Sequence, residues 1–570
     1  MKRLICFALA IVLILSLVIT GCGNKEDSQA NKDSSKSADS QGGNANESKK
    51  NEIGGEKVKV TKPGTFPIVE ESTTLNIMVT DNVSVEDFAT NEFTKWYEEK
   101  TKVHIDWSIL PANGADEKLN LVLAGQDYPD VFMDCPIDTT QVMNYGKQGI
   151  FIPLNDYIEK YGVEVKKLFN DMEYVKNLLT FPDGKIYSMP YVNQCYHCSM
   201  AQKMWIYKPW LEKLNLDMPT TTDDFYEVLK VFHDKDPNGN GKKDEVPLAG
   251  ANNGWFSEID GFLMCPFVYN DGRNRMIIKD GNLDVTFNKP GWKEGLKYMH
   301  KLYKEGLMAP ESFTQDADQL KQMGENPDTV VLGTAPGGHT GVFTQFYGES
   351  GRWLEYEAIP PLKGPNGYSS CYYNPFGVGV TSFIVTKKCE IPEVAVRWAD
   401  GMYDRETTLR SVFGRLDEEW GWAGDEEIGI NGKKAIYKTL KPWTEGVQNV
   451  CWMQSGPSLR TNELRLGEVA NPDEPLETIL YKETNEKYDP HKPNINSIVP
   501  PLAFTEEQAN EIADFKKTIN DYVNEMLARF VTGDADIDKD WDSYLKELEN
   551  MNLKRYIDLS QEAYDAKYKK

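Results

Sequence analysis

Residues 234–245 hold a dense run of oxygen ligands, with the sequence Asp-Lys-Asp-Pro-Asn-Gly-Asn-Gly-Lys-Lys-Asp-Glu. Ca²⁺ takes about six to eight oxygen ligands, and a loop with carboxylates and amides at alternate positions supplies them. Counted from Asp234, the EF-hand positions fall on Asp236, Asn238, Gly239 and Glu245. Pro247 lies where the second helix of an EF-hand would have to begin. The stretch therefore predicts a Ca²⁺ loop at the end of a helix over 223–233, with a solvated Asn-Gly turn as the alternative.

Cys195-Tyr-His-Cys198 is the one pair of cysteines at metal-ligand spacing. No second C-x-x-C or H-x₃₋₅-H follows to complete four zinc ligands. The chain has nine cysteines, of which Cys6 and Cys22 fall in an N-terminal export signal, and the other seven are irregularly spaced. A zinc or redox role for the pair stays open, but we expect buried free thiols.

Catalytic motifs are missing from the sequence. It contains no G-x-S-x-G nucleophile elbow and no H-E-x-x-H zinc motif. A glycine-rich stretch at 334–341, expected to follow a strand at 329–332, lacks the Gly-Lys-Ser/Thr of a phosphate loop, which favours a turn or a close approach of the backbone to a neutral ligand. A glycoside hydrolase stays an alternative, because some of the 88 acidic residues must lie about 5–9 Å apart.

The N-terminus carries a secretory signal. Lys2 and Arg3 precede the apolar run 4–18, and Ile-Thr-Gly-Cys22 closes it. This tetrapeptide resembles a bacterial lipobox, which implies cleavage after residue 21 and diacylglycerol and a further acyl chain such as palmitate on Cys22. Two or three acyl chains suffice for stable anchoring to a membrane. An ordinary secreted protein with a chance cysteine is the alternative.

Residues 22–72 are predicted to form a lipidated cysteine and a disordered tether, because they are polar and contain few large apolar residues. The whole chain has a formal net charge of −25. Such an acidic protein repels phosphate backbones and offers no basic patch to anionic lipid. We therefore expect no nucleic-acid partner, and membrane contact through the lipid alone.

The ordered part reads as an α/β protein. Strands are predicted at 75–79, 103–109 and 128–133, with helices between them, which implies a mostly parallel sheet. Ligands meet such a sheet at the carboxyl ends of its strands, where Asp81 lies. Near the C-terminus, the capping box of Thr505 and Gln508 opens an amphipathic helix, and a second helix carries Trp541.

Five stretches together resemble the family-1 extracellular solute-binding proteins of sugar ABC importers. They are Gly184-Lys185-x-Tyr187-x-x-Pro190, Trp205–Leu214, Thr220–Phe225, which lacks the family's Trp, Tyr372–Thr386 and Ile391–Tyr403. The resemblance implies a type II periplasmic-binding-protein-like fold, with a hinge and a ligand cleft between two lobes. It places the first lobe at 73–190 plus about 376–450, and the second at about 191–375 plus 451–570.

The resemblance also implies a function. The expected protein is a monomer, not an enzyme, held at the extracytoplasmic face of the cell membrane. It captures a carbohydrate, an oligosaccharide above all, and delivers it to the permease subunits of an ABC importer.

The calcium loop of oligosaccharide-binding members of this family is similar to residues 236–245. That register leaves Asp234 out and places one structural Ca²⁺ among the side chains of Asp236, Asn238, Asn240, Asp244 and Glu245 and the carbonyl of Lys242.

Aromatic rings and a carboxylate are the predicted ligand contacts, because sugar faces stack on rings while their hydroxyls bond to polar groups. The candidates near loops and strand ends are Asp81, Trp255, Tyr372, Tyr373 and Trp452. For each aromatic residue, a place in the hydrophobic core is the alternative.

Overall fold

A six-stranded sheet forms the centre of the first half of the fold in the computed structural model, which describes residues 57–441 and 446–569. Its strand order is β14-β4-β11-β3-β1-β2. The strands are β1 (Thr73–Thr80), β2 (Val103–Leu110), β3 (Val131–Met133), β4 (Ser188–Asn193), β11 (Val378–Val385) and β14 (Ser458–Arg460). All but β11 run parallel, so their carboxyl ends meet at one edge. The predicted strands at 75–79 and 103–109 are confirmed.

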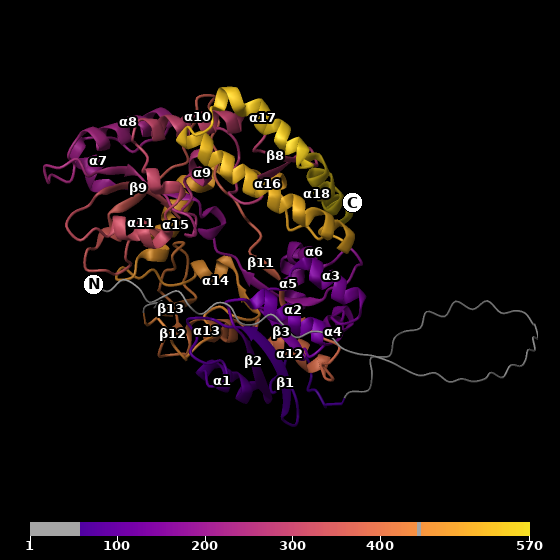
Figure 1. The fold of residues 1–570 in the computed structure, drawn as a ribbon. Coiled ribbons are helices and arrows are strands. Elements are labelled where there is room, and N and C mark those ends of the chain that lie inside the picture. The colour runs from indigo at the N-terminus through magenta and orange to yellow at the C-terminus, as the bar shows by residue number, and fades with distance from the viewer. Residues whose placement is uncertain (1–56, 442–445, 570) are drawn as a thin grey trace, which may run out of the picture. The chain divides into compact units, whose positions relative to one another are not determined.

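Helices cover both faces of this sheet (Figure 1). They are α1 (Glu92–Thr101), α2 (Ala115–Gly125), α3 (Thr139–Lys147), α4 (Asn155–Tyr161), α5 (Glu164–Asp171), α6 (Glu173–Leu179), α12 (Pro392–Gly401) and α13 (Arg405–Phe413). Apolar strand residues such as Leu75, Ile77 and Val79 are fully buried beneath them. A short hairpin, β12 (Trp420–Trp422) with β13 (Tyr437–Thr439), follows α13.

A second, four-stranded sheet has the order β10-β5-β9-β6. Its strands are β5 (Lys203–Tyr207), β6 (Val246–Leu248), β9 (Leu332–Gly337) and β10 (Tyr356–Ile359), and a separate hairpin pairs β7 (Met276–Lys279) with β8 (Asn282–Val285). Its own hydrophobic core includes α7 (Lys208–Leu214), α8 (Thr222–Asp234), α9 (Ile259–Leu263), α10 (Pro290–Lys304) and α11 (Ala317–Gly324). The two sheets therefore organise two cores.

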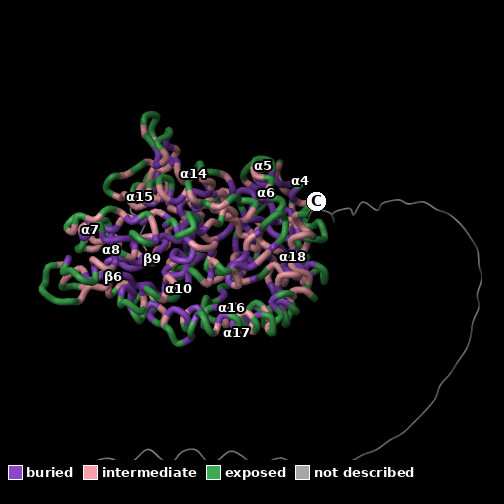
Figure 2. Tube along the Cα trace, turned by 90° about the horizontal axis from the view of Figure 1, so that it is seen from above, coloured by how far each residue is buried: buried purple, intermediate pink, exposed green. Residues whose placement is uncertain are grey.

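Three C-terminal helices, yellow in Figure 1, belong to the second core. They are α16 (Glu506–Thr532), α17 (Ile537–Asn550) and α18 (Leu553–Tyr568). The capping box of Thr505 and Gln508 that opens α16 is confirmed. Figure 2 shows how the buried segments run through the interior while loops such as the one beside α8 and β6 are exposed. Among the residues that the structure describes, no helix is both long and apolar enough to cross a bilayer.

The expected strand at 329–332 is shifted along the chain. Residues 332–337 form β9, so half of the predicted glycine-rich loop is a central strand. Gly333 allows this position, because a Cβ there would meet the Phe232 ring at 2.7 Å and the Pro247 carbonyl oxygen at 2.9 Å. Close packing of β9 on α8 thus requires a glycine at 333, between the predicted strand and the predicted loop.

Two expected boundaries are also corrected. The second lobe was predicted to include everything from 451, but β14 pairs with β4 and Trp452 lies in the core of the first sheet. The tether was predicted to extend to 72, but residues 57–72 pack on the first sheet's helices, with Ile68 and Val69 buried. Cys22 and the signal lie outside the described residues.

Arg397 on α12 explains why residues 57–72 are ordered. Its guanidinium, on a side chain that is 4% exposed, donates hydrogen bonds to four backbone carbonyls of this segment. The acceptors are the carbonyl oxygens of Thr61 at 2.6 Å, Lys62 at 3.1 Å, Thr65 at 2.7 Å and Ile68 at 3.0 Å. This segment, whose Ile68 and Val69 also join the first core, is thus held by a side chain from a distant part of the chain.

Arg397→Met should destabilise the first lobe by about 3 kcal/mol, because it leaves buried carbonyls without donors. Urea unfolding followed by circular dichroism measures the change. Arg529→Met is the control, since Arg529 forms an exposed ion pair with Glu525 on α16 and should cost less than about 1 kcal/mol. Equal losses for the two variants would contradict the role of Arg397.

Candidate functional site

The chain passes between the two sheets along three segments. Residues 194–202 join β4 to β5, residues 360–377 join β10 to β11, and residues 461–505 run from β14 through α14 (Asn462–Leu466) and α15 (Leu476–Glu483) to α16. The first two segments are tied together, since Asn374 N–H donates to the Ser199 carbonyl at 2.8 Å. They leave from the edge where the carboxyl ends of the parallel strands meet, which is where ligands bind in open α/β sheets.

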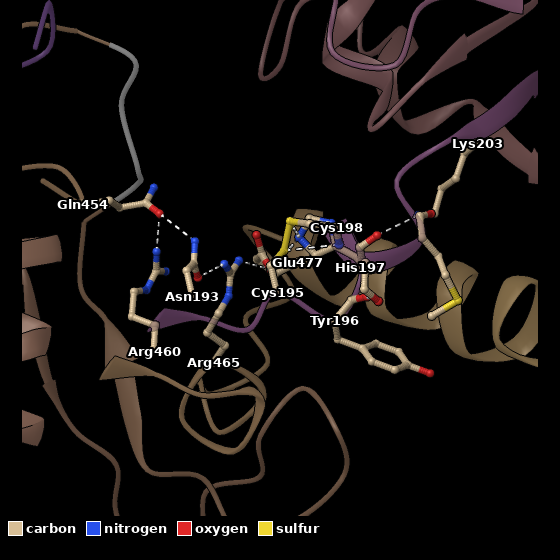
Figure 3. Close-up of a disulfide and its surroundings, with 12 residues drawn as sticks. Asn193, Cys195, Tyr196, His197, Cys198, Lys203, Gln454, Arg460, Arg465 and Glu477 are labelled. Atoms are coloured by element: carbon tan, nitrogen blue, oxygen red, sulfur yellow. Dashed lines mark hydrogen bonds and ion pairs between the residues drawn. A yellow bond between two sulfur atoms is a disulfide. The ribbon is translucent and has the colours of Figure 1, made fainter. Parts of the chain in front are cut away.

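A polar cluster, here called the crossing cluster, lies at this edge. It consists of Asn193, Gln454, Arg460, Arg465 and Glu477 (Figure 3). Asn193 and Arg460 are register partners at the ends of β4 and β14. Both bond to the Gln454 Oε1 atom, Arg460 at 2.5 Å and Asn193 at 3.3 Å. Arg465 donates to Asn193 Oδ1 at 2.9 Å and pairs with Glu477 at 3.5 Å.

The charged side chains of the crossing cluster neutralise one another. Burial alone would raise the pKa of Glu477, but His197 and the two arginines hold it well below its usual range. The Glu477 side chain is 39% exposed, so an ionised carboxylate remains accessible. The cluster can therefore offer both charged acceptors and guanidinium donors to the hydroxyl groups of a ligand.

Cys195 and Cys198 form a disulfide in the first segment, with their Cα atoms 5.0 Å apart. The expectation of free thiols is wrong for this pair and confirmed for Cys135, Cys265, Cys371, Cys389 and Cys451, which are free and buried. Cys195, His197 and Cys198 lie close enough to hold a metal, but a disulfide leaves no thiolate ligand for zinc. The structure therefore does not support a zinc site here.

Trp255 stands beside this disulfide-bonded turn. Its ring is 36% exposed and its centroid lies 6.3 Å from the His197 ring and 5.0 Å from the His339 ring. Gly338 backs it, since a Cβ at that position would overlap the indole. The glycine-rich stretch after β9 thus lets the backbone pass directly behind an aromatic ring.

Two cavities adjoin the predicted aromatic residues. One of about 620 Å³ is lined by Trp255, and one of about 280 Å³ by Tyr372 and Tyr373. They share Asp271 and Arg273 in their walls. The Phe256 ring links them, with its centroid 4.8 Å from that of Tyr372. The structure therefore brings three of the five predicted ligand residues to one region. Tyr372 is only 6% exposed, so the core alternative holds for it, whereas Trp255 is exposed and Tyr373 is partly buried.

The other two predicted ligand residues, Asp81 and Trp452, lie away from these cavities. Asp81 is exposed at the end of β1, and its neighbour Asn82 donates to Ser455 Oγ at 3.1 Å, beside Gln454. Trp452 is 1% exposed, and its Nε1–H donates to Thr94 Oγ1 at 2.8 Å inside the first core. It presents no face to a ligand, so the core alternative holds for Trp452.

Sequence reasoning missed the crossing cluster itself. Asn193 could have been found as the residue that ends a strand, but β14 has three residues and no readable period. Gln454 lies in a loop, Arg465 on α14 and Glu477 in the first turn of α15, all far from Asn193 in the sequence. No local pattern marks residues that meet only when the chain crosses.

The loop after α8 gathers the predicted calcium ligands. Asp236 accepts backbone N–H bonds from Gly239 at 2.7 Å and Gly241 at 2.8 Å, and both glycines have φ near +75°. The amides of Asn238 and Asn240 each lie about 2.9 Å from an Asp244 oxygen. The chain thus folds these four oxygen-bearing side chains around one another.

The environment of the Glu245 carboxylate indicates whether this loop suits a cation. Its Oε2 atom is buried and has no hydrogen-bond partner. Burial raises the pKa of Glu245, and the nearby carboxylates of Asp236 and Asp244 add to this effect. A bound Ca²⁺ would satisfy the unpartnered oxygen and neutralise the three carboxylates, so the residues present fit the ion.

Glu468, near the crossing cluster, predicts a pH dependence. Burial and the Glu477 carboxylate raise its pKa to about 7, above that of an unfolded chain, so the folded protein binds the proton more tightly. Stability should therefore fall as pH rises from about 4.5 to 7, by up to about 1.4 kcal/mol per pH unit. Urea midpoints at pH 5 and 7.5 measure this fall. Glu468→Gln should make the fall smaller, with the rest due to groups such as the buried Asp134, whose pKa burial raises to about 6. Glu463→Gln, an exposed control on α14, should leave the fall unchanged. An unflattened profile for Glu468→Gln would contradict the assignment.

Comparison with known proteins identifies a family and a relative that this chain resembles. The family model described as bacterial extracellular solute-binding protein matches residues 81–408. The fructooligosaccharide ABC transporter substrate-binding protein FusA of Streptococcus pneumoniae is 30% identical over 526 residues, which cover 88% of this chain and 91% of FusA.

Solved structures of FusA share the fold. FusA in complex with kestose matches with a TM-score of 0.70 and 27% identity, over 86% of this chain and 99% of that one. The EF-hand mutant of FusA in complex with fructo-nystose matches with a TM-score of 0.69 and 28% identity, over the same shares. The fold is thus the type II solute-binding fold, and the chain belongs to the family of bacterial extracellular solute-binding proteins.

Proposed function

We propose that this protein captures an oligosaccharide outside the cell and delivers it to an ABC importer. The observation that carries the proposal is the match to FusA along 91% of that protein's length, a protein named for fructooligosaccharides. The exposed Trp255 ring beside the polar crossing cluster supports it, because a sugar needs a ring for its apolar face and charged groups for its hydroxyls.

The ligand site of the proposal lies between two lobes. The first comprises residues 57–193, 378–441 and 446–460, which include the first sheet, and the second comprises the second sheet with α16–α18. Trp255, Tyr372 and Tyr373 belong to the second lobe, whereas Asp81 and Asn193 end strands of the first. A ligand that touches both sides would draw the lobes together by hinge bending.

In this proposal the N-terminal lipid anchor holds the protein at the membrane, where it delivers the sugar to the importer. Cleavage before Cys22 and acylation of its thiol and amino group would tether the monomer to the extracytoplasmic face of the membrane. A polar linker of about 35 residues has a root-mean-square reach of about 3 nm. The folded lobes could then load a sugar away from the bilayer and present it to the permease subunits, without chemical change to the sugar.

A structural Ca²⁺ completes the proposal. The side chains of Asp236, Asn238, Asn240, Asp244 and Glu245 and the Lys242 carbonyl would hold it, and its charge would offset the three carboxylates. The buried, unpartnered Glu245 oxygen supports this set. The name of the FusA EF-hand mutant shows that an EF-hand is described in that relative. The ion would stabilise the loop between α8 and β6.

Calorimetric titration with kestose tests the function. The full-length protein should bind without hydrolysing the sugar, and Trp255→Ala should weaken binding at least about tenfold, or about 1.4 kcal/mol. Trp96→Ala is the control, because Trp96 lies on α1 against Lys100 and Arg410, away from the crossing cluster. Release of fructose would instead favour the hydrolase alternative, and an unchanged Trp255→Ala affinity would remove Trp255 from the site.

Melting temperatures in Ca²⁺ and in chelator test the metal. At a hundredfold excess over Kd, an ion that binds only the folded state stabilises by about 2.7 kcal/mol. This corresponds to a rise of about 5–10 °C in a lobe of this size. Glu245→Gln should abolish the rise, whereas Glu227→Gln, exposed on α8, should keep it. Identical melting of the wild type in both buffers would show that the loop is a solvated turn.

A further inference from the structure

The Cys195–Cys198 disulfide occupies the first segment between the sheets, one residue beyond Gln194 and five before β5. It is the one disulfide among residues 57–441 and 446–569. With a sequence separation of three, it closes a very short loop. Short loops gain little from restricting the unfolded chain, so the bond's main effect is on the shape of this turn.

Further bonds fix the turn on both sides of the disulfide. The Cys198 N–H donates to Cys195 Sγ at 3.3 Å, and the Ser199 N–H donates to the Cys195 carbonyl at 2.9 Å. Lys203, which is fully buried, donates to the carbonyls of His197 at 3.2 Å and Met200 at 2.7 Å. The backbone on either side of His197 therefore has little freedom while the disulfide is intact.

His197 is the side chain that this turn presents (Figure 3). It is 7% exposed, its Nε2 atom lies 3.4 Å from Glu477 Oε2, and its ring meets the Trp255 ring edge to face. Glu477 in turn pairs with Arg465, which donates to Asn193 at the end of β4. A single buried imidazole thus contacts both the exposed ring and the exposed carboxylate of the candidate ligand surface.

We propose that the Cys195–Cys198 disulfide is a positioning device for the ligand surface: it holds His197 against Trp255 and Glu477, so that sugar affinity depends on the redox state of this bond. The proposal rests on the proposed function as a carbohydrate-binding protein. His197 and the two cysteines are positioning residues in it, because they act on the sugar through Trp255 and Glu477.

A dithiol reagent reduces the Cys195–Cys198 disulfide in two thiol–disulfide exchange steps. Cys198 is more exposed than Cys195, so a thiolate of the dithiol attacks Cys198 Sγ and Cys195 leaves as a thiolate that takes up a proton. The second thiol of the reagent then attacks the mixed disulfide and releases Cys198 as a thiol. Two electrons pass from the dithiol, which becomes a disulfide, to the protein.

Kestose titration of the full-length protein with and without dithiothreitol tests the proposal. Alkylation and mass spectrometry establish that Cys195 and Cys198 are reduced in the treated sample. Affinity should fall about tenfold on reduction. Equal affinity of the oxidised and fully reduced protein would overturn the proposal.

Variants separate positioning from folding. The double variant Cys195→Ser/Cys198→Ser should bind kestose with the affinity of the reduced wild type, and dithiothreitol should not change this affinity. Cys135→Ser is the control, because it alters a buried free thiol of the first lobe, and it should keep both the wild-type affinity and the redox response. His197→Gln should bind weakly in either state, because the link from the turn to Trp255 and Glu477 is gone. A full redox response in His197→Gln would show that the disulfide acts by another route, and would overturn the role of His197.

Histidine NMR distinguishes failure of this inference from failure of the proposed function. The chain has six histidines, and comparison with His197→Gln assigns the His197 ring signals. Reduction should shift these signals whether or not kestose binds. If the oxidised protein binds no sugar, the proposed function fails. If the His197 signals stay in place when the disulfide is reduced, the positioning role fails.

Discussion

Several charged side chains lose contact with water where the chain crosses between the two sheets. Each of them needs an oppositely charged or hydrogen-bonding partner there, and the rest of the site depends on these pairings. An uncompensated buried charge costs several kcal/mol. Arg465 meets this requirement by bonding to Asn193 in the first sheet and to Glu477 beside the second. The same contacts that compensate these charges therefore join the two halves of the fold and leave one partly exposed carboxylate for a ligand.

The two sheets differ in what they contribute to this region. The first supplies strand ends, such as Asn193 and Arg460, whose positions are set by the register of β4 with β14. The second supplies aromatic rings, such as the exposed Trp255, which is backed by Gly338, and the partly buried Tyr373. Polar groups on a rigid edge and rings on an opposing surface suit a ligand with both hydroxyl groups and apolar faces. This division of roles is consistent with the family to which the chain belongs.

Acidic surface charge is a second constraint, with a net charge of −25 over the whole chain. Asp236, Asp244 and Glu245 add to it within ten residues, and amide and backbone donors meet only part of their demand, since one Glu245 oxygen stays without a partner. A cation is the simplest compensation for such a loop. The crossing cluster uses guanidinium groups instead, because its charges lie on separate parts of the chain.

The sequence by itself determined the features that depend on neighbours along the chain. Alternation in β1 and β2, the capping box of α16 and the spacing of oxygen ligands at 236–245 are local signals, and so is the order of motifs that resembles the solute-binding family. Tertiary structure alone decided which distant groups meet. Arg397 orders residues 57–72, β14 joins the first sheet with three residues, and Trp452 enters the core while Trp255 stays exposed. Cys195 and Cys198 are only three residues apart, but their spacing allows free thiols, metal ligands or a disulfide, and only the structure decides among these. Asn193, Arg465 and Glu477 meet across the crossing segments, and contacts between segments far apart in sequence leave no periodic trace in either segment.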